Sequence, residues 1–209
     1  MSDKIKLPKS IKVGGIYYDV YEKEIGFVDD NTLAGIHKGC SSEIKVDTTR
    51  AAQKVLETFI HEIVHATDFT CLGYDLEEEH VELLTKNFIQ VFVDNNLQLN
   101  NDNAKLPKKI RIGPYEYKVV FPYIFKDMPG VTAFSVIHEN LAIFLSDREG
   151  EDIYKKDYIK FNLFTAIYIV IINLYRSETG ISVDFKIASS ALFQVFRDNK
   201  LEEFIKKYW

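Results

Sequence analysis

Residues 58–66 of this chain read TFIHEIVHA and contain the pattern HExxH inside an apolar run. An α-helix turns once every 3.6 residues, so residues that are four apart lie on the same face. His61 and His65 are therefore expected one turn apart on one face, with Glu62 beside them. Two imidazoles at this spacing can grip one zinc ion, and an adjacent carboxylate can take a proton from a water molecule at the metal. The stretch predicts a metal site on a helix.

The residues around the pattern favour a helix over residues 50–70. Apolar side chains recur there at helical spacing, at Val55, Phe59, Ile63, Ala66 and Phe69. Thr48 or Thr49 is expected to cap the start of this helix, and Gly73 to end it. An isolated histidine pair on a solvated helix is the alternative, but the apolar neighbours indicate that part of the motif is buried, where unpartnered ionisable groups are costly.

A second helix is expected over residues 76–95. Its buried stripe consists of Val81, Leu84, Phe88, Val91 and Phe92. Because a catalytic zinc ion usually has three protein ligands, the acidic start of this helix is the nearest source of a third. Glu78 is the first choice, since it lies at the edge of the stripe. Glu79, Glu77 and His80 remain alternatives, because periodicity does not separate neighbouring positions.

Other side chains near the motif have hypothetical roles. His37 and Tyr74 are candidates to stabilise negative charge on a reacting carbonyl. Asp68, close after His65, either orients that imidazole or lies on the surface. The strand expected at residues 43–47 is the predicted sheet edge, at which an extended substrate would pair.

The second half of the chain repeats the first. LPKKIRIG at 106–113 restates LPKSIKVG at 7–14, and ALFQVFRDN at 191–199 restates NFIQVFVDN at 87–95. We therefore predict an α+β fold with two tandem units, residues 1–98 and 104–209, each a small twisted β-sheet packed on two helices. An Asn-rich linker is expected between them.

The repeat also provides an internal comparison for the motif. When the two copies are aligned, Tyr168 takes the place of His61, Ile169 that of Glu62, and Ile172 that of His65. The second copy therefore lacks the metal motif. Residues 166–172, rich in β-branched side chains, are nevertheless expected to be helical because their counterpart is the HExxH helix.

Composition narrows the class of protein. The formal net charge of −5, with no basic stripe, disfavours nucleic acid as a partner. Cys40 and Cys71 show no disulfide framework, which fits a reducing compartment. Residues 1–6 lack the apolar core of a secretory signal, and the apolar run 161–175 is too short and too polar to cross a bilayer. A cytoplasmic protein without a membrane span is expected.

With HEIVHA at 61–66 and EEHVELL at 78–84, the chain resembles the small, gluzincin-like HExxH metallopeptidase-like proteins of phages and prophages. In that family a short sheet precedes the HExxH helix, and the next helix supplies a glutamate. The resemblance covers residues 7–95. It implies Zn²⁺ bound by His61, His65 and Glu78, with Glu62 as general base. The resemblance itself assigns no substrate. From the hydrolytic mechanism we expect a protein or peptide substrate, such as a host protein, and the host cytoplasm as location if the chain is phage-encoded.

The sequence thus predicts a zinc-dependent hydrolase of peptide bonds. Two alternatives stay open: a protein-binding module with a structural zinc, in which the degenerate copy is a docking surface, and a metal-free module that binds a host protein. An open ligand position at the metal would favour the hydrolase, whereas a fourth protein ligand would favour the structural zinc.

Overall fold

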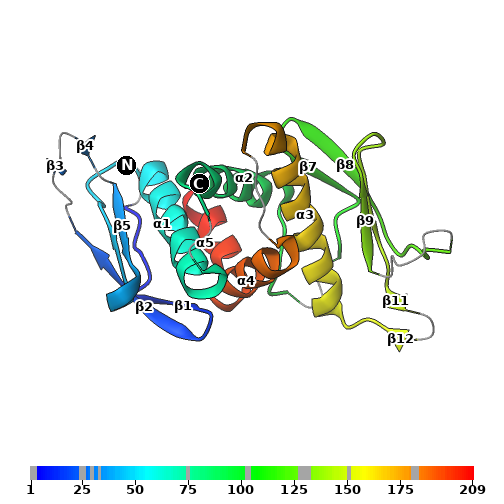
Figure 1. Ribbon diagram of the computed structural model, residues 1–209, viewed down its shortest axis with the longest axis horizontal. Helices are drawn as coiled ribbons and strands as arrows, with labels where there is room; N and C mark the ends of the chain where they lie inside the picture. Colours follow the sequence, from blue (N-terminus) through cyan, green and yellow to red (C-terminus); the bar gives the residue numbers. More distant parts are fainter. Residues whose placement is uncertain are drawn as a thin grey trace.

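The computed structural model describes residues 4–23, 27–28, 31–32, 34–73, 76–101, 105–126, 133–149, 152–179 and 184–209. The fold is α+β: over these residues it has two four-stranded mixed sheets and five α-helices. Figure 1 shows the sheets at the two ends of an elongated molecule, with the helices packed between them.

The first sheet has the strand order β1-β2-β6-β5. Its strands are β1 (Ser10–Val13), β2 (Ile16–Glu22), β5 (Gly35–Lys38) and β6 (Glu43–Val46). β1 and β2 form a hairpin, in which Gly14 and Gly15 make the tight turn with positive φ. β2 pairs with β6 in parallel, and β6 pairs with β5 antiparallel.

The second sheet repeats this topology. Its strands are β7 (Lys109–Ile112), β8 (Tyr115–Val120), β9 (Phe134–Ile137) and β10 (Ala142–Leu145), in the order β7-β8-β10-β9. The three pairings again run antiparallel, parallel and antiparallel. The repeat seen in the sequence is therefore a repeat of strand order and direction, which is compatible with two tandem units.

The helices follow the sheets in each half. They are α1 (Ala52–Thr67), α2 (Glu78–Asn95), α3 (Lys156–Thr179), α4 (Phe185–Asp198) and α5 (Leu201–Tyr208). The short elements are β3 (Phe27–Val28), β4 (Asn31–Thr32), η1 (Gly39–Ser41), the π-helical turn η2 (Asp68–Leu72), β11 (Arg148–Glu149) and β12 (Asp152–Ile153). The predicted helix at residues 166–172 is confirmed, since it lies inside α3.

Helix α3 is a core helix of this fold. Its segment Lys156–Leu174 is long and apolar enough to cross a membrane by length and composition alone, but 67% of the segment is buried inside the protein. Phe164 of this helix stacks on Phe88 of α2, with ring centroids 4.9 Å apart. Phe88 also contacts Phe196 of α4 at 5.3 Å. One hydrophobic core therefore runs through both halves of the chain.

An asparagine of each half also makes hydrogen bonds to an edge strand of the other half. The Asn199 side chain at the end of α4 accepts a hydrogen bond from the Lys12 backbone N–H and donates to the Lys12 carbonyl, both at 2.7 Å. In the same way Asn95, at the end of α2, pairs with the backbone of Arg111 at 2.6 and 2.8 Å. Asn199 and Asn95 thus make two equivalent pairs of hydrogen bonds, one to β1 and one to β7, which we call clasps.

The described start of the segment between the halves is packed against the helices. Leu97 and Leu99 are buried, and Lys160 Nζ donates to the Leu99 carbonyl at 3.1 Å. The Asn100 backbone and side chain both donate to the buried carboxylate of Glu202 in α5, at 3.1 and 2.7 Å. The first residues of the connection between the halves are therefore fixed to the helices.

Two local predictions for α1 are also wrong. Neither Thr48 nor Thr49 caps the helix, since the N-cap position is Ala51, which has no capping side chain. Thr49 instead donates through its N–H and its hydroxyl to Asp47, at 3.0 and 2.6 Å. Phe69 is 40% exposed rather than buried, because the backbone has entered the π-helical turn η2 by that residue.

Candidate metal centre

The two motif histidines lie on the exposed side of α1. His61 and His65 have side-chain exposures of 19% and 20%, and their rings are 4.7 Å apart between centroids. The opposite face of α1 is apolar and buried against the sheet and the other helices, and this burial fixes the rotation of the helix. The periodicity of the sequence is therefore what turns both imidazoles to the same side.

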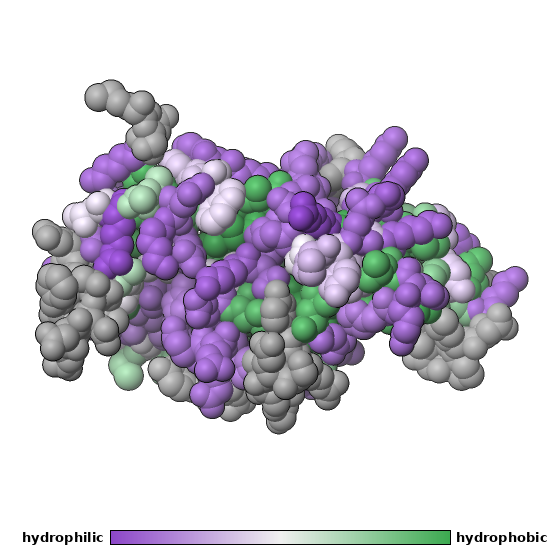
Figure 2. All heavy atoms as spheres, turned by 90° about the horizontal axis from the view of Figure 1, so that it is seen from above, coloured by the Kyte–Doolittle hydropathy of each residue, from purple (hydrophilic) through white to green (hydrophobic). Residues whose placement is uncertain are grey.

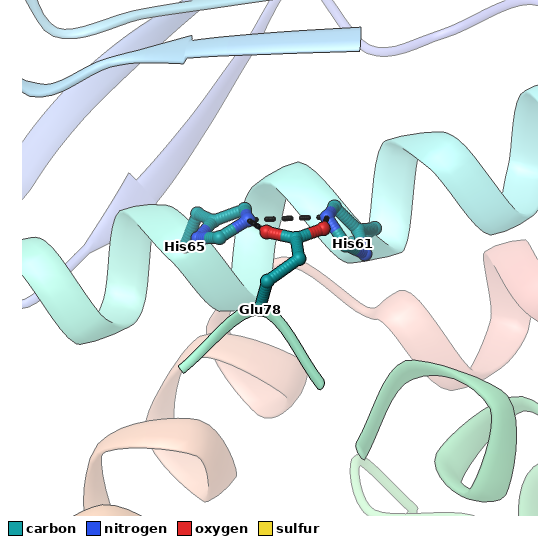
Figure 3. Close-up of side chains that lie close together, drawn as sticks. All are labelled: His61, His65 and Glu78. Atoms are coloured by element: carbon teal, nitrogen blue, oxygen red, sulfur yellow. Dashed lines mark hydrogen bonds and ion pairs between the residues drawn. The ribbon is translucent and has the colours of Figure 1, made fainter. Parts of the chain in front are cut away.

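Glu78 reaches these histidines from the first residue of α2 (Figure 3). Its Oε1 lies 3.0 Å from His61 Nε2, and its Oε2 lies 3.0 Å from His65 Nε2. The two Nε2 atoms are 3.1 Å apart. The structure thus brings together the three residues that the sequence put first as metal ligands.

The alternatives to Glu78 lie elsewhere. Glu77 is the N-cap residue of α2, Glu79 is exposed, and His80 is only 5% exposed. Within the described residues, none of them joins the cluster of possible ligand atoms. The N-terminal end of α2 is held in place by Asp68, whose two carboxylate oxygens lie 3.3 Å from the Leu76 N–H. This contact gives Asp68 a structural task between η2 and α2, and Asp68 is buried rather than on the surface.

The donor set fits a zinc ion. In a tetrahedral site with ligand distances of about 2.0–2.1 Å, neighbouring ligand atoms lie about 3.3 Å apart. The three separations of 3.0–3.1 Å are close to this value. Two imidazoles and one carboxylate are also a usual donor set for catalytic zinc. Among the described residues, the cluster consists of His61, His65 and Glu78.

Neither models of protein families nor curated proteins nor solved structures match this chain. The geometry of the site therefore carries the functional interpretation.

Glu62 lines the same cavity from its inner side. This cavity has a volume of about 630 Å³ and is bordered by α1, β5 and the start of α2. Glu62 is 6% exposed, and its carboxylate accepts a hydrogen bond from the backbone N–H of His37. Burial, and then the charge of Glu78, raise the pKa of Glu62 to about 8. A nearby bound cation would lower this pKa, so Glu62 is suited to exchange protons near neutral pH.

Gly35 allows β5 to approach Glu62 this closely. A Cβ atom at Gly35 would lie 2.5 Å from Glu62 Oε1 and 2.6 Å from Thr58 Cγ2, which is far inside van der Waals contact. The sequence interpretation missed this residue, since an isolated glycine in a short segment has no periodic signal.

β5 is one of the two edge strands of the first sheet, and the prediction that residues 43–47 form the edge is wrong. β6 (Glu43–Val46) is paired on both sides, with β2 and with β5. β5 contains only the four residues Gly35–Lys38, too few for an alternating pattern to be recognised. The strand that borders the candidate metal centre is therefore β5.

His37 also lines the cavity, as the sequence suggested. Its ring packs between Tyr18 and Phe69, with centroid distances of 5.5 and 5.6 Å, and its Nε2 is buried without a hydrogen-bond partner in the described part of the chain. Burial, with a smaller effect of His65, lowers the pKa of His37 to about 4. His37 is therefore a neutral imidazole at neutral pH. Tyr74, the other residue considered for this role, lies outside the described residues.

The second half has no equivalent centre among its described residues. Tyr168 and Ile172 are buried in the core, and Ile169 is half-buried. His138 has both ring nitrogens engaged, Nδ1 by the Tyr117 hydroxyl at 3.0 Å and Nε2 by the Asn173 amide at 3.2 Å.

Proposed function

We propose that this protein is a zinc-dependent hydrolase of peptide bonds, with His61, His65 and Glu78 as metal ligands and Glu62 as general base. The observation that carries the proposal is the triangle of three ligand atoms, 3.0–3.1 Å apart, at the wall of a 630 Å³ cavity that Glu62 also lines. Cavities of roughly 300–1,000 Å³ are typical of sites for small molecules or peptide side chains.

Each residue has a defined task in this proposal. A bound zinc ion would supply Lewis acidity, which polarises the substrate carbonyl and acidifies water. Glu62 accepts the proton of the attacking water and passes it to the leaving amine. The His37 backbone N–H keeps the Glu62 carboxylate in one orientation, and the His37 ring, neutral at neutral pH, forms part of the cavity wall.

Three features favour hydrolysis over a purely structural zinc. A structural site is normally closed by four protein ligands, whereas three are present among the described residues. The ligands line an open cavity rather than the core. A buried carboxylate with a raised pKa stands beside them. The proposal also keeps, on the basis of the sequence alone, the likeness to gluzincin-like proteins of phages with zincin-like units, a protein or peptide such as a host protein as substrate, and the cytoplasm as location.

Glu62→Gln tests the catalytic part of this proposal. The amide keeps the size of the side chain but accepts no proton, so the variant should retain zinc and lose turnover of a quenched-fluorescence peptide library by a factor of about 10² or more. Glu57→Gln changes a carboxylate on the same cavity and is the matched control, with turnover within a few-fold of the parent. Equal turnover in Glu62→Gln and the parent would contradict the assigned role.

A further inference from the structure

A second cavity, distinct from the candidate metal centre, lies in the second half of the molecule. It has a volume of about 580 Å³ and lies between the segment that leads into β7, the strand β12 and the start of α3. A neighbouring cavity of about 280 Å³ shares four lining residues with it, Lys105, Leu106, Pro107 and Lys160. We refer to these two neighbouring cavities, which share residues 105–107, as the groove.

The groove depends on an insertion that the first half lacks. In the first half, residues 47–51 connect β6 with α1. In the second half, the longer connection of residues 146–155 contains the hairpin β11–β12, and its Ile153 and Tyr154 form one wall of the cavity. The related position in the first half, between Ile5 and the start of α1, holds a cavity of about 200 Å³. The copy without the metal motif therefore has the larger cavity at this position.

The lining combines positive charge with apolar surface. Four lysines line the cavity: Lys105, Lys108, Lys156 and Lys160. Lys160 is buried and donates a hydrogen bond to the Leu99 carbonyl, while the other three lysines are exposed at the rim of the cavity. Within the described part of the chain no Asp or Glu lines the cavity, although the protein as a whole has a net charge of −5. The charged residues that line the groove are thus positive, whereas the net charge of the protein is negative.

The apolar part of the lining is unusually exposed. Ile153 has 72% of its surface accessible, and Phe121 has 39%. Val119 and Ile159 continue this wall inward. The molecular surface in Figure 2 is mainly hydrophilic, with hydrophobic patches over the helices and over the half that contains β7–β10. Exposed apolar side chains bordered by charges of one sign mark a binding surface rather than a solvated one.

We propose that this groove binds an extended peptide segment in which acidic and apolar residues are interspersed. The rim lysines would pair with the acidic side chains, and Ile153, Phe121 and Val119 would contact the apolar ones. Two neighbouring cavities that share lining residues suit an extended chain rather than a compact ligand. A nucleic acid backbone would use the lysines but would leave the apolar wall uncovered, so the peptide is the better fit. The proposal does not depend on the metal centre.

Fluorescence anisotropy tests the proposal with a short labelled peptide in which Glu and Leu alternate. A peptide with Gln in place of Glu is the comparison. The full-length protein should bind the acidic peptide about tenfold more tightly than the neutral one, and added salt should reduce the difference. Lys105→Glu/Lys108→Glu should weaken binding of the acidic peptide by about tenfold or more, and Ile153→Ser by several-fold.

The first half provides the matched control. By the sequence repeat, Lys6 and Lys9 are the counterparts of Lys105 and Lys108, and all four are exposed. Lys6→Glu/Lys9→Glu should leave peptide binding unchanged within about twofold. Circular dichroism would verify that both double variants are folded.

Three results would overturn the proposal. One is equal affinity for the acidic and neutral peptides. Another is that single-stranded oligo-dT displaces the acidic peptide, and that Lys105→Glu/Lys108→Glu abolishes oligo-dT binding while Ile153→Ser does not. This result would assign the groove to nucleic acid. The third is a concentration-dependent dimer in sedimentation that Ile153→Ser dissociates, which would assign the groove to a second copy of this chain.

Discussion

Substitution of Asn199 by Ala should destabilise the whole molecule, because this side chain clasps the edge strand of the other half. The variant loses two hydrogen bonds to the Lys12 backbone, both 2.7 Å long, from a half-buried position. A hydrogen bond of this kind contributes a net of about 1 kcal/mol, so the loss is about 2 kcal/mol. The nearby pair Lys12–Asp198 at 3.5 Å is exposed and adds little.

For a chain of this length, a loss of about 2 kcal/mol corresponds to a fall in Tm of about 4–8 °C. Differential scanning calorimetry measures this shift, with Asn101→Ala in the connecting segment as an exposed control that should change Tm by about 1 °C or less. Asn95→Ala removes the equivalent clasp on Arg111 and should have a similar effect. The double variant should show the sum of the two losses, because the clasps share no side chain.

Because one core runs through both halves, each single variant should still unfold in one transition. Two separate transitions, of which Asn199→Ala shifts only one, would refute the shared core and the reciprocal clasps. A Tm within about 1 °C of the parent would refute the contribution of the clasp.

Three further predictions concern buried groups. Gly35→Ala should lower stability by about 1–3 kcal/mol, measured by urea unfolding, and should reduce turnover while zinc is retained, because the new methyl group meets Glu62 and not the ligand atoms. Burial raises the pKa of Glu202, so this carboxylate favours folding below its unfolded pKa of about 4.3 and opposes it as pH rises through the folded pKa. Glu202→Gln should therefore match the parent near pH 4 and exceed it in urea unfolding at about pH 8, whereas a difference independent of pH would contradict this reasoning. Tyr168→Phe should raise Tm by about 2–4 °C, since it removes a buried hydroxyl that has no hydrogen-bond partner among the described residues, and a lower Tm would show that the hydroxyl is satisfied.

The sequence predicted those elements in which apolar residues recur at a regular spacing or in which a whole segment is repeated. The apolar stripe of α1 and the repeat of whole segments each rest on several residues that agree. The spacing of His61 and His65 followed from helix geometry alone. Glu78 could only be ranked first, because the difference between Glu77, Glu78 and Glu79 depends on the residue at which α2 begins.

Other features depend on long-range packing and could not be predicted. A stripe of apolar residues shows that α2 is buried but not that Phe88 packs on α3 and α4 of the other half. The edge position of β5 is set by pairing with β6 rather than by its four residues. Helix α5 was missed, and with it the contact of Phe204 with Phe59, two residues before His61, at 5.4 Å. The second half therefore supports the helix that bears the candidate metal ligands.

The zinc content of the protein tests the central claim most directly. It is measured by elemental mass spectrometry on protein that has been purified without chelator and dialysed. The proposed centre predicts about one zinc ion per chain in the parent. It predicts that His61→Ala and Glu78→Ala lose the metal. Glu79→Ala, which changes the adjacent exposed carboxylate, should retain about one zinc ion. A parent without zinc, or equal zinc content in the parent, His61→Ala and Glu78→Ala, would contradict the metal centre.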